Sequence, residues 1–325
     1  TRHLTSKCIT SLFFLFLLGG TGSVFAATCV FSGSSTTISS DCSGGALSAD
    51  MSGAITINSG VTHDLTSADF ITTNDLGAYI NNGTVDGGTN GFAFTNYETI
   101  GAFTNNGTVT FNGSSGFINE YKNGSQPGVI TTFTNNGTWN SGGSNAFFNQ
   151  ADSTIGTWTN TGTFNCTAAA YCFRNSGSIT TLNNSGTMNT DEPGGYGFYN
   201  QSGVIGTINN SGTWVAPSSN WTFGTGTITT MTNTGTFTGQ LRIRSAGTLA
   251  TLNNDQGASG NNALDYAEKL PTNYNIIVNS ASDFGKVVFS SVSGTTNFGV
   301  HSSSTLATGT TYSAVIVGLS AGEIA

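Results

Sequence analysis

One sequence pattern recurs along the chain and constrains its fold more than any other feature. An apolar residue, any residue, Asn, any residue, Gly, Thr and another apolar residue follow one another in that order seven times. The copies are 24, 30, 25, 24, 26 and 23 residues apart, and their asparagines are Asn81, Asn105, Asn135, Asn160, Asn184, Asn210 and Asn233. A period in the twenties is typical of a solenoid, in which each repeat packs only against its neighbours. The chain is therefore expected to present an extended surface rather than a deep pocket.

A second, weaker pattern of an aromatic residue, any residue and Asn lies between copies of the first. Its clearest copies are Phe94/Asn96, Phe117/Asn119, Phe147/Asn149, Phe173/Asn175 and Phe198/Asn200. The 30-residue gap is explained by an insertion over residues 121–128, which a solenoid accommodates as a loop. Together the patterns predict about 8–10 coils of roughly 24 residues each.

The residues within each repeat favour strands. They are rich in Thr, Ile, Val, Phe and Trp and alternate between apolar and polar side chains, which predicts an all-β fold. Residues 263–270 are compatible with one or two helical turns at most. Because Asn and Gly tolerate left-handed backbone angles, each Asn-x-Gly is predicted to turn a corner, with positive φ at Gly186 and Gly212. The recurring Asn side chains are predicted to hydrogen-bond as a ladder along the stack.

Large aromatic side chains follow Gly-Thr in several coils. We expect them to stack inward, since aliphatic residues hold the same position in other coils; an outward stripe suited to sugar or partner binding is the alternative. The residues concerned are Trp139, Phe164, Trp214 and Phe237, with Val85, Val109 and Met188 as their equivalents. Trp221 lies outside the pattern and is the best single candidate for an exposed aromatic side chain.

Charge is scarce, and this limits the classes of partner. Charged residues make up 7% of the chain, against about 25% in an ordinary domain, and the formal net charge is −8. No basic patch is visible in the sequence, so nucleic acid and anionic membranes are not expected as partners.

The N-terminus and the cysteines indicate export. Residues 1–26 read as a signal peptide, with basic residues, an apolar core and a small-residue cleavage site in that order. The remaining four cysteines form two close pairs, Cys29/Cys42 and Cys166/Cys172. An even number of cysteines in an exported protein predicts disulfides, whereas a zinc site would need tighter spacing or nearby histidines.

The acidic residues give little support to catalysis. The carboxylates of the coils are scattered, and no two are expected at the same position of neighbouring coils: Asp86, Glu98, Glu120, Asp152, Asp191 and Glu192. The densest polar cluster is His63-Asp64 with Asp69 and Asp75, which we interpret as a solvated first coil. Neither a nucleophile elbow nor a repeated calcium-binding nonapeptide is present. No catalytic, cofactor or metal site is therefore predicted.

Three parts of the chain resemble the passenger region of bacterial autotransporters. They are the export signal with its cysteine-bracketed segment ATCVFSGSSTTISSDCSG, the repeats TNNGTV, TNNGTW, LNNSGTM and INNSGTW, and the C-terminal elements DFGKVV, TLATGTTYSAVI and GLSAGEI. The resemblance implies a right-handed parallel β-helix that is exported through the outer membrane and displayed or shed. It divides the chain into a signal peptide (1–26), an N-terminal capping segment (27–75), a repeat array (76–262) and a passenger end (263–325). The translocator barrel that closes such proteins is not in this sequence and is expected in the full-length chain.

The expected function is adhesion rather than catalysis. The rod would use many weak contacts to bind a glycan or protein on a host or neighbouring cell. A secreted β-helical polysaccharide-degrading enzyme and a purely structural stalk are the alternatives. The expected location is the cell surface or the extracellular space, with no cofactor.

Overall fold

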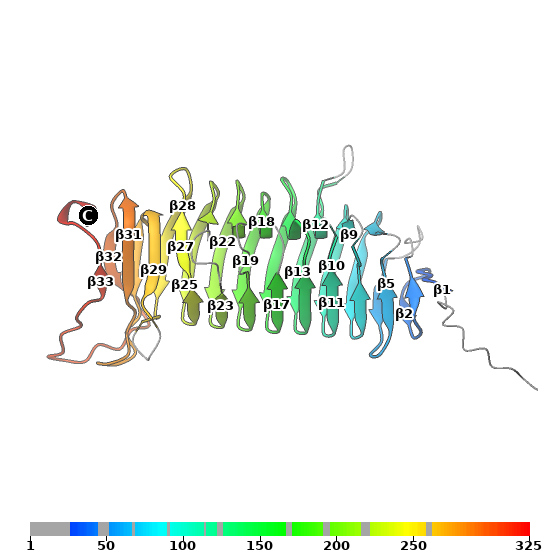
Figure 1. The fold of residues 1–325 in the computed structure, drawn as a ribbon, viewed down its shortest axis with the longest axis horizontal. Coiled ribbons are helices and arrows are strands. Elements are labelled where there is room, and N and C mark those ends of the chain that lie inside the picture. The colour runs from blue at the N-terminus through cyan, green and yellow to red at the C-terminus, as the bar shows by residue number, and fades with distance from the viewer. Residues whose placement is uncertain are drawn as a thin grey trace, which may run out of the picture.

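The chain forms a β-solenoid of stacked parallel strands, seen side-on in Figure 1. The computed structural model describes residues 27–44, 52–66, 69–89, 92–113, 115–121, 126–166, 171–190, 196–215, 222–257 and 262–325. About nine coils with a spacing of about 24 residues follow one another along the long axis. The predicted all-β solenoid is thus confirmed.

Successive coils place their strands in four sheets. Sheet 1 has 12 strands: β2 (Thr36–Ile38), β4 (Ala54–Ile57), β7 (Leu76–Asn81), β10 (Thr99–Asn105), β13 (Val129–Asn135), β16 (Thr154–Asn160), β19 (Ser178–Asn184), β22 (Val204–Asn210), β25 (Thr227–Asn233), β28 (Thr248–Asn254), β30 (Asn273–Ile276) and β32 (Asn297–Val300). Sheet 2 has 10 strands: β1 (Ala27–Thr28), β3 (Cys42–Ser43), β5 (Thr62–Asp64), β8 (Thr84–Asp86), β11 (Thr108–Phe111), β14 (Thr138–Ser141), β17 (Thr163–Cys166), β20 (Thr187–Asn189), β23 (Thr213–Val215) and β26 (Thr236–Thr238).

The third face of the solenoid is shared by two shorter sheets. Sheet 3 has six strands: β6 (Phe70–Thr72), β9 (Phe92–Asn96), β12 (Ser115–Asn119), β15 (Asn145–Asn149), β18 (Tyr171–Asn175) and β21 (Tyr196–Asn200). Sheet 4 has five strands: β24 (Thr222–Phe223), β27 (Gln240–Ile243), β29 (Leu264–Lys269), β31 (Val287–Ser293) and β33 (Ile316–Val317). A short 3₁₀ helix, η1 (Ala321–Glu323), lies near the C-terminus. Residues 264–269, which the sequence allowed to form one or two helical turns at most, are a strand because they pair with β27 and β31.

Large apolar side chains from the three faces meet in one continuous core. Trp139, Phe164 and Trp214 are fully buried and Phe237 is 5% exposed, which confirms the inward orientation predicted for them. Aromatic rings also stack from coil to coil, for example Phe117 on Phe147 at 5.0 Å and Phe147 on Phe173 at 4.9 Å between ring centroids. This burial of apolar area is the main stabilising contribution to the fold.

Two ladders of buried asparagines run along the stack. In the first, each Nδ2 donates to the Oδ1 of the next coil at 2.7–3.1 Å, from Asn81 through Asn105, Asn135, Asn160, Asn184, Asn210 and Asn233 to Asn254. In the second, the donor–acceptor distances are 2.8 Å, from Asn96 through Asn119, Asn149 and Asn175 to Asn200. Both rows are almost completely buried. The Asn of the second sequence pattern thus has the same structural role as the Asn of the first.

The glycine of each Asn-x-Gly corner is required for a reason other than the predicted one. Positive φ occurs at other glycines of the described residues, but not at Gly186 or Gly212. Instead, a Cβ at Gly186 would lie 2.1 Å from the carbonyl oxygen of Gly162, and a Cβ at Gly212 would lie 2.1 Å from that of Gly186. The predicted positive φ was therefore wrong. The corner backbones of neighbouring coils approach so closely that no side chain fits between them.

Both cysteine pairs form disulfides. Cys29–Cys42 connects the end of β1 to β3, the neighbouring strand of sheet 2, and Cys166–Cys172 connects sheet 2 to sheet 3 within one coil. Two disulfides in one chain indicate an oxidising, extracytoplasmic environment. In sheet 1, β4 pairs with β7 and β28 pairs with β30. The sheet therefore continues across both expected limits of the repeat array, at residues 75/76 and 262/263. The predicted signal peptide lies outside the described residues, within which no helix is long and apolar enough to cross a membrane.

Candidate functional site

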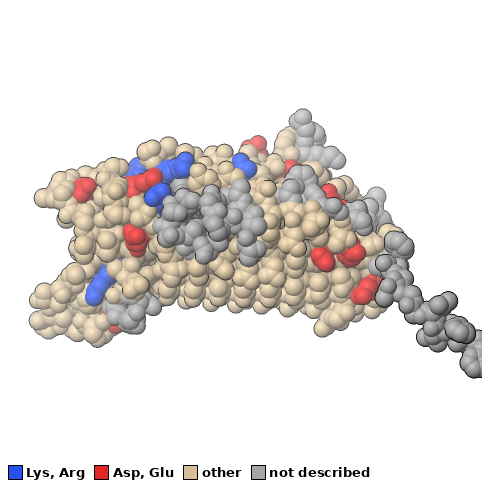
Figure 2. All heavy atoms as spheres, in the orientation of Figure 1, with Lys and Arg blue, Asp and Glu red and all other residues tan. Residues whose placement is uncertain are grey.

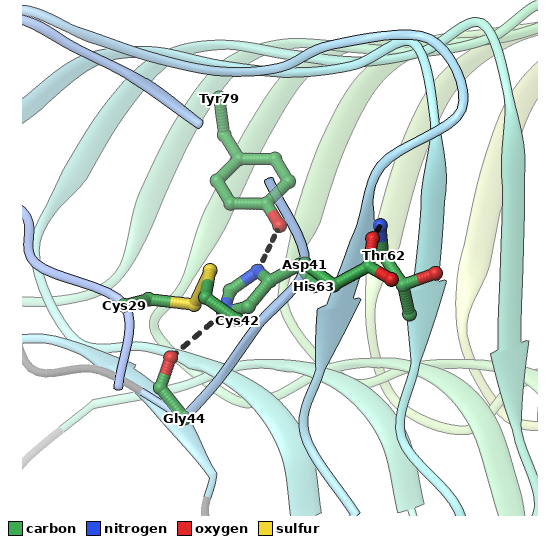
Figure 3. Close-up of a disulfide and its surroundings, with 7 residues drawn as sticks. All are labelled: Cys29, Asp41, Cys42, Gly44, Thr62, His63 and Tyr79. Carbon is green, nitrogen blue, oxygen red and sulfur yellow. Dashed lines mark hydrogen bonds between the residues drawn. A yellow bond between two sulfur atoms is a disulfide. The ribbon is translucent and has the colours of Figure 1, made fainter. Parts of the chain in front are cut away.

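The histidine of the N-terminal polar cluster lies inside the solenoid. His63 is completely buried, and its ring nitrogens hydrogen-bond to the Tyr79 hydroxyl at 2.8 Å and the Gly44 carbonyl at 2.9 Å (Figure 3). Burial lowers the pKa of His63 below its ordinary 6.5, an effect opposed by the Gly44 hydrogen bond and the charge of Asp64. The interpretation of this cluster as a solvated coil was therefore wrong for His63. Both ring nitrogens already have partners in the core, so the side chain is structural.

Burial of a neutral histidine makes the first coils sensitive to acid. The folded state disfavours the protonated ring, so the contribution of His63 to stability is complete above its unfolded pKa of about 6.5 and is lost as the pH falls. We expect hydrogen exchange in β5 and β7 to accelerate between about pH 7 and about pH 5, after correction for intrinsic exchange rates. The variant His63→Gln should lose this dependence. Identical pH profiles for the two proteins would contradict it.

Two carboxylates do share a coil position, contrary to expectation. Asp64 on β5 and Asp86 on β8 are register partners. One oxygen of each already accepts a backbone N–H of the following turn, from Thr66 at 2.8 Å and Gly88 at 3.0 Å. This pair therefore caps two stacked turns. Among the described residues, no group of three or more His, Cys, Asp or Glu side chains could hold a metal ion. Asp191 and Glu192 lie outside the described residues.

The outer face of sheet 3 differs from that of sheet 1. On sheet 1 one outward row consists of hydroxyl side chains in register: Thr132, Thr157, Thr181, Thr207, Thr230 and Thr251. On sheet 3 the corresponding rows become aromatic and basic. Register places Phe148, Arg174 and Tyr199 in one row, and Tyr171 and Tyr196 in the next. We call Phe148, Tyr171, Arg174, Tyr196, Tyr199 and Arg244 the aromatic–arginine surface.

Three tyrosines form the centre of this surface. Tyr171 stacks on Tyr196 with 5.4 Å between ring centroids, and Tyr199 lies 5.3 Å from Tyr171 and 4.9 Å from Tyr196. All three rings are half-buried, so one side of the group faces solvent. Contacts among the rings restrict their rotamers, and a rigid group of rings loses little entropy when it binds a ligand.

An arginine lies on each side of the tyrosines. The Arg174 guanidinium lies 4.4 Å from the Phe148 ring centroid and 5.0 Å from that of Tyr171. Arg244 is exposed; its guanidinium lies 5.4 Å from the Tyr196 centroid, and its Nη2 donates to the Tyr196 hydroxyl at 3.0 Å. Cation–π contacts of this kind are worth about 0.5–1 kcal/mol at exposed positions. Figure 2 shows that most of the visible face carries neither basic nor acidic side chains.

A shallow groove of about 350 Å³ runs beside the aromatic–arginine surface. We call it the serine groove; it is lined by Asp152, Ser153, Ser176, Gly177, Ser178, Ser202, Gly203 and Val204. The Ser176 hydroxyl approaches Gln201 Oε1 at 3.5 Å, and the same oxygen accepts hydrogen bonds from Arg174. Groove and aromatic surface therefore meet at Gln201. Together they offer hydroxyl groups next to flat apolar rings.

Sequence reasoning missed this surface for a physical reason. Three of its residues, Phe148, Arg174 and Tyr199, occupy the variable position of the aromatic-x-Asn pattern, where the two preceding coils carry Thr95 and Ile118. No repeat marks such a position, and only the register of the strands brings its residues together. Trp221, the aromatic residue singled out from the sequence, lies outside the described residues.

No protein-family model, curated protein or solved structure matches the chain. The assignment of function consequently rests on the geometry of the molecule itself.

Proposed function

We propose that the protein is an exported adhesin whose aromatic–arginine surface binds a saccharide on another cell. The observation that supports this most is the half-exposed group of Tyr171, Tyr196 and Tyr199, on a solenoid whose other outward rows are largely hydroxyl and amide. Aromatic rings bind the apolar faces of sugar rings, and adjacent polar groups bind their hydroxyls. The serine groove supplies such polar groups.

The solenoid architecture is consistent with this function. A shallow binding surface on a long rod forms weak individual contacts, and a cell that displays many copies gains affinity through avidity. The resemblance to autotransporter passengers supports export and display through an outer-membrane translocator. The partner would be a glycan, or a glycosylated protein, of a host or neighbouring cell.

Binding without turnover distinguishes adhesion from the enzymatic alternative. The Asp64/Asp86 pair lies on sheet 2, several coils from the tyrosines, and one oxygen of each carboxylate accepts a hydrogen bond from a turn. We therefore expect a saccharide retained by the protein to keep its chain length. Cleavage that is abolished by Asp64→Asn would instead support a polysaccharide-degrading enzyme, and absence of both activities would support a stalk.

The tyrosines provide a direct test of the binding surface. We expect residues 27–325 to bind a subset of a saccharide array, and the double variant Tyr171→Ala/Tyr199→Ala to bind about 10-fold more weakly because two rings are removed. Tyr121 is 41% exposed and belongs to a different part of the surface, so Tyr121→Ala is the matched control. Equal affinity of the double variant and the wild type would exclude this surface as the site.

A further inference from the structure

We propose that the saccharide is anionic and that Arg174 binds one of its carboxylates. This inference rests on the proposed saccharide binding and adds the chemical class of the ligand. The proposed ligands are polymers of uronic acids, in which a carboxylate recurs along a linear chain.

Among the residues that the structure describes, no carboxylate forms an ion pair with Arg174 or Arg244. Within the part of the chain that the structure describes, the ion pair between Arg242 Nε and Glu268 Oε1 at 3.4 Å is the only one. Arg174 hydrogen-bonds to neutral Gln201, and Arg244 to the Tyr196 hydroxyl. The chain has 16 acidic residues against 8 lysines and arginines. Among the described residues none of these carboxylates pairs with Arg174 or Arg244, which indicates an anionic ligand.

The guanidinium of Arg174 is held in place before any ligand binds. Its Nε and Nη2 both donate to Gln201 Oε1, at 2.8 and 2.5 Å, while Phe148 and Tyr171 pack against it. A guanidinium has five N–H donors, so three remain for a ligand. These three belong to the two terminal nitrogens, the pair that binds a carboxylate through two parallel hydrogen bonds. Because the side chain is already ordered, little conformational entropy is lost on binding.

Arg174 and Arg244 together suit a polymer better than a single sugar. Arg174 lies on β18 and Arg244 directly follows β27; these strands are three coils apart along the third face of the solenoid, a separation of about 14 Å. The tyrosine group lies between them. A linear uronate chain that lies along the solenoid axis can thus place sugar rings on the tyrosines and carboxylates at both arginines.

A matched pair of polymers tests the charge requirement. Residues 27–325 are titrated with polygalacturonate and with the same polymer after complete methyl esterification, which keeps the sugar ring and removes the charge. We expect the acid to bind at least about 10-fold more tightly, and its affinity to fall with added salt. Arg174→Ala should abolish most of this difference, and Arg174→Lys should restore only part of it, because lysine lacks the planar fork.

Arg242→Ala is the matched control, since it removes the same charge from an arginine that already has a carboxylate partner. We expect it to leave the affinity for polygalacturonate unchanged, and thermal unfolding of each variant verifies folding. Equal affinity for the acid and its ester would overturn the inference while leaving saccharide binding intact. Binding of neutral saccharides alone would overturn it as well. Failure to bind any saccharide would overturn both this inference and the proposed function.

Discussion

The variant Gly186→Ala is expected to unfold far more easily than the wild type, although it adds only one methyl group. The new Cβ would lie 2.1 Å from the Gly162 carbonyl oxygen, well inside van der Waals contact. That oxygen also accepts the Thr187 N–H at 2.9 Å, so it cannot move away without losing a hydrogen bond between coils. We expect a loss on the order of 3 kcal/mol in the free energy of unfolding, measured by urea denaturation followed by circular dichroism.

The matched control for this prediction is Gly322→Ala. No atom lies within 4 Å of a Cβ at Gly322, so its stability should change by a few tenths of a kcal/mol at most. Wild-type stability of Gly186→Ala would refute the close packing of the corners.

A buried ladder asparagine is expected to be almost as sensitive to a change of one atom. Asn160 accepts from Asn135 Nδ2 at 2.7 Å and donates to Asn184 Oδ1 at 2.9 Å and to the Thr187 carbonyl at 3.0 Å. In Asn160→Asp the amide donor is replaced by an oxygen that faces these acceptors in a fully buried site. We expect a loss on the order of 3 kcal/mol near neutral pH, measured by the same denaturation.

The pH dependence of this variant identifies the cause. Burial raises the pKa of the introduced carboxyl in the folded state, so the penalty is largest when the unfolded chain is ionised and decreases as the pH falls. Near pH 4 or below, a protonated oxygen can again donate to Asn184. Asn136→Asp is the control, since Asn136 is exposed and belongs to the corner row outside the core. A penalty independent of pH would contradict an effect of buried charge.

The sequence predicted those parts of the molecule that repeat in every coil. The Asn ladder, the inward aromatic rows and the stacking of parallel strands all leave a periodic signal, because each coil must satisfy the same packing and hydrogen-bonding requirements. The corner glycines were identified by the same signal. Their physical role was not, because φ is a local property whereas the approach of Gly162 to Gly186 becomes visible only when two coils are stacked.

The candidate site leaves no such signal. Phe148, Arg174 and Tyr199 differ in chemistry and are separated by about one repeat each, so only the strand register shows that they are neighbours. The same holds for Asp64 and Asp86, because Asp64 lies in a coil before the first copy of the repeat pattern. His63 gave a misleading signal, since its acidic neighbours in sequence lie outside the core that buries its ring.

Attachment of protein-coated beads to cells tests the central claim, adhesion through the aromatic–arginine surface, most directly. Beads that carry residues 27–325 are compared with beads that carry Tyr171→Ala/Tyr199→Ala at equal density, on cells with intact glycans and on cells whose glycans have been oxidised with periodate. The account predicts attachment of wild-type beads to intact cells, and its loss with either the variant or the oxidised cells. Equal attachment of both proteins, or attachment unaffected by oxidation, would contradict it.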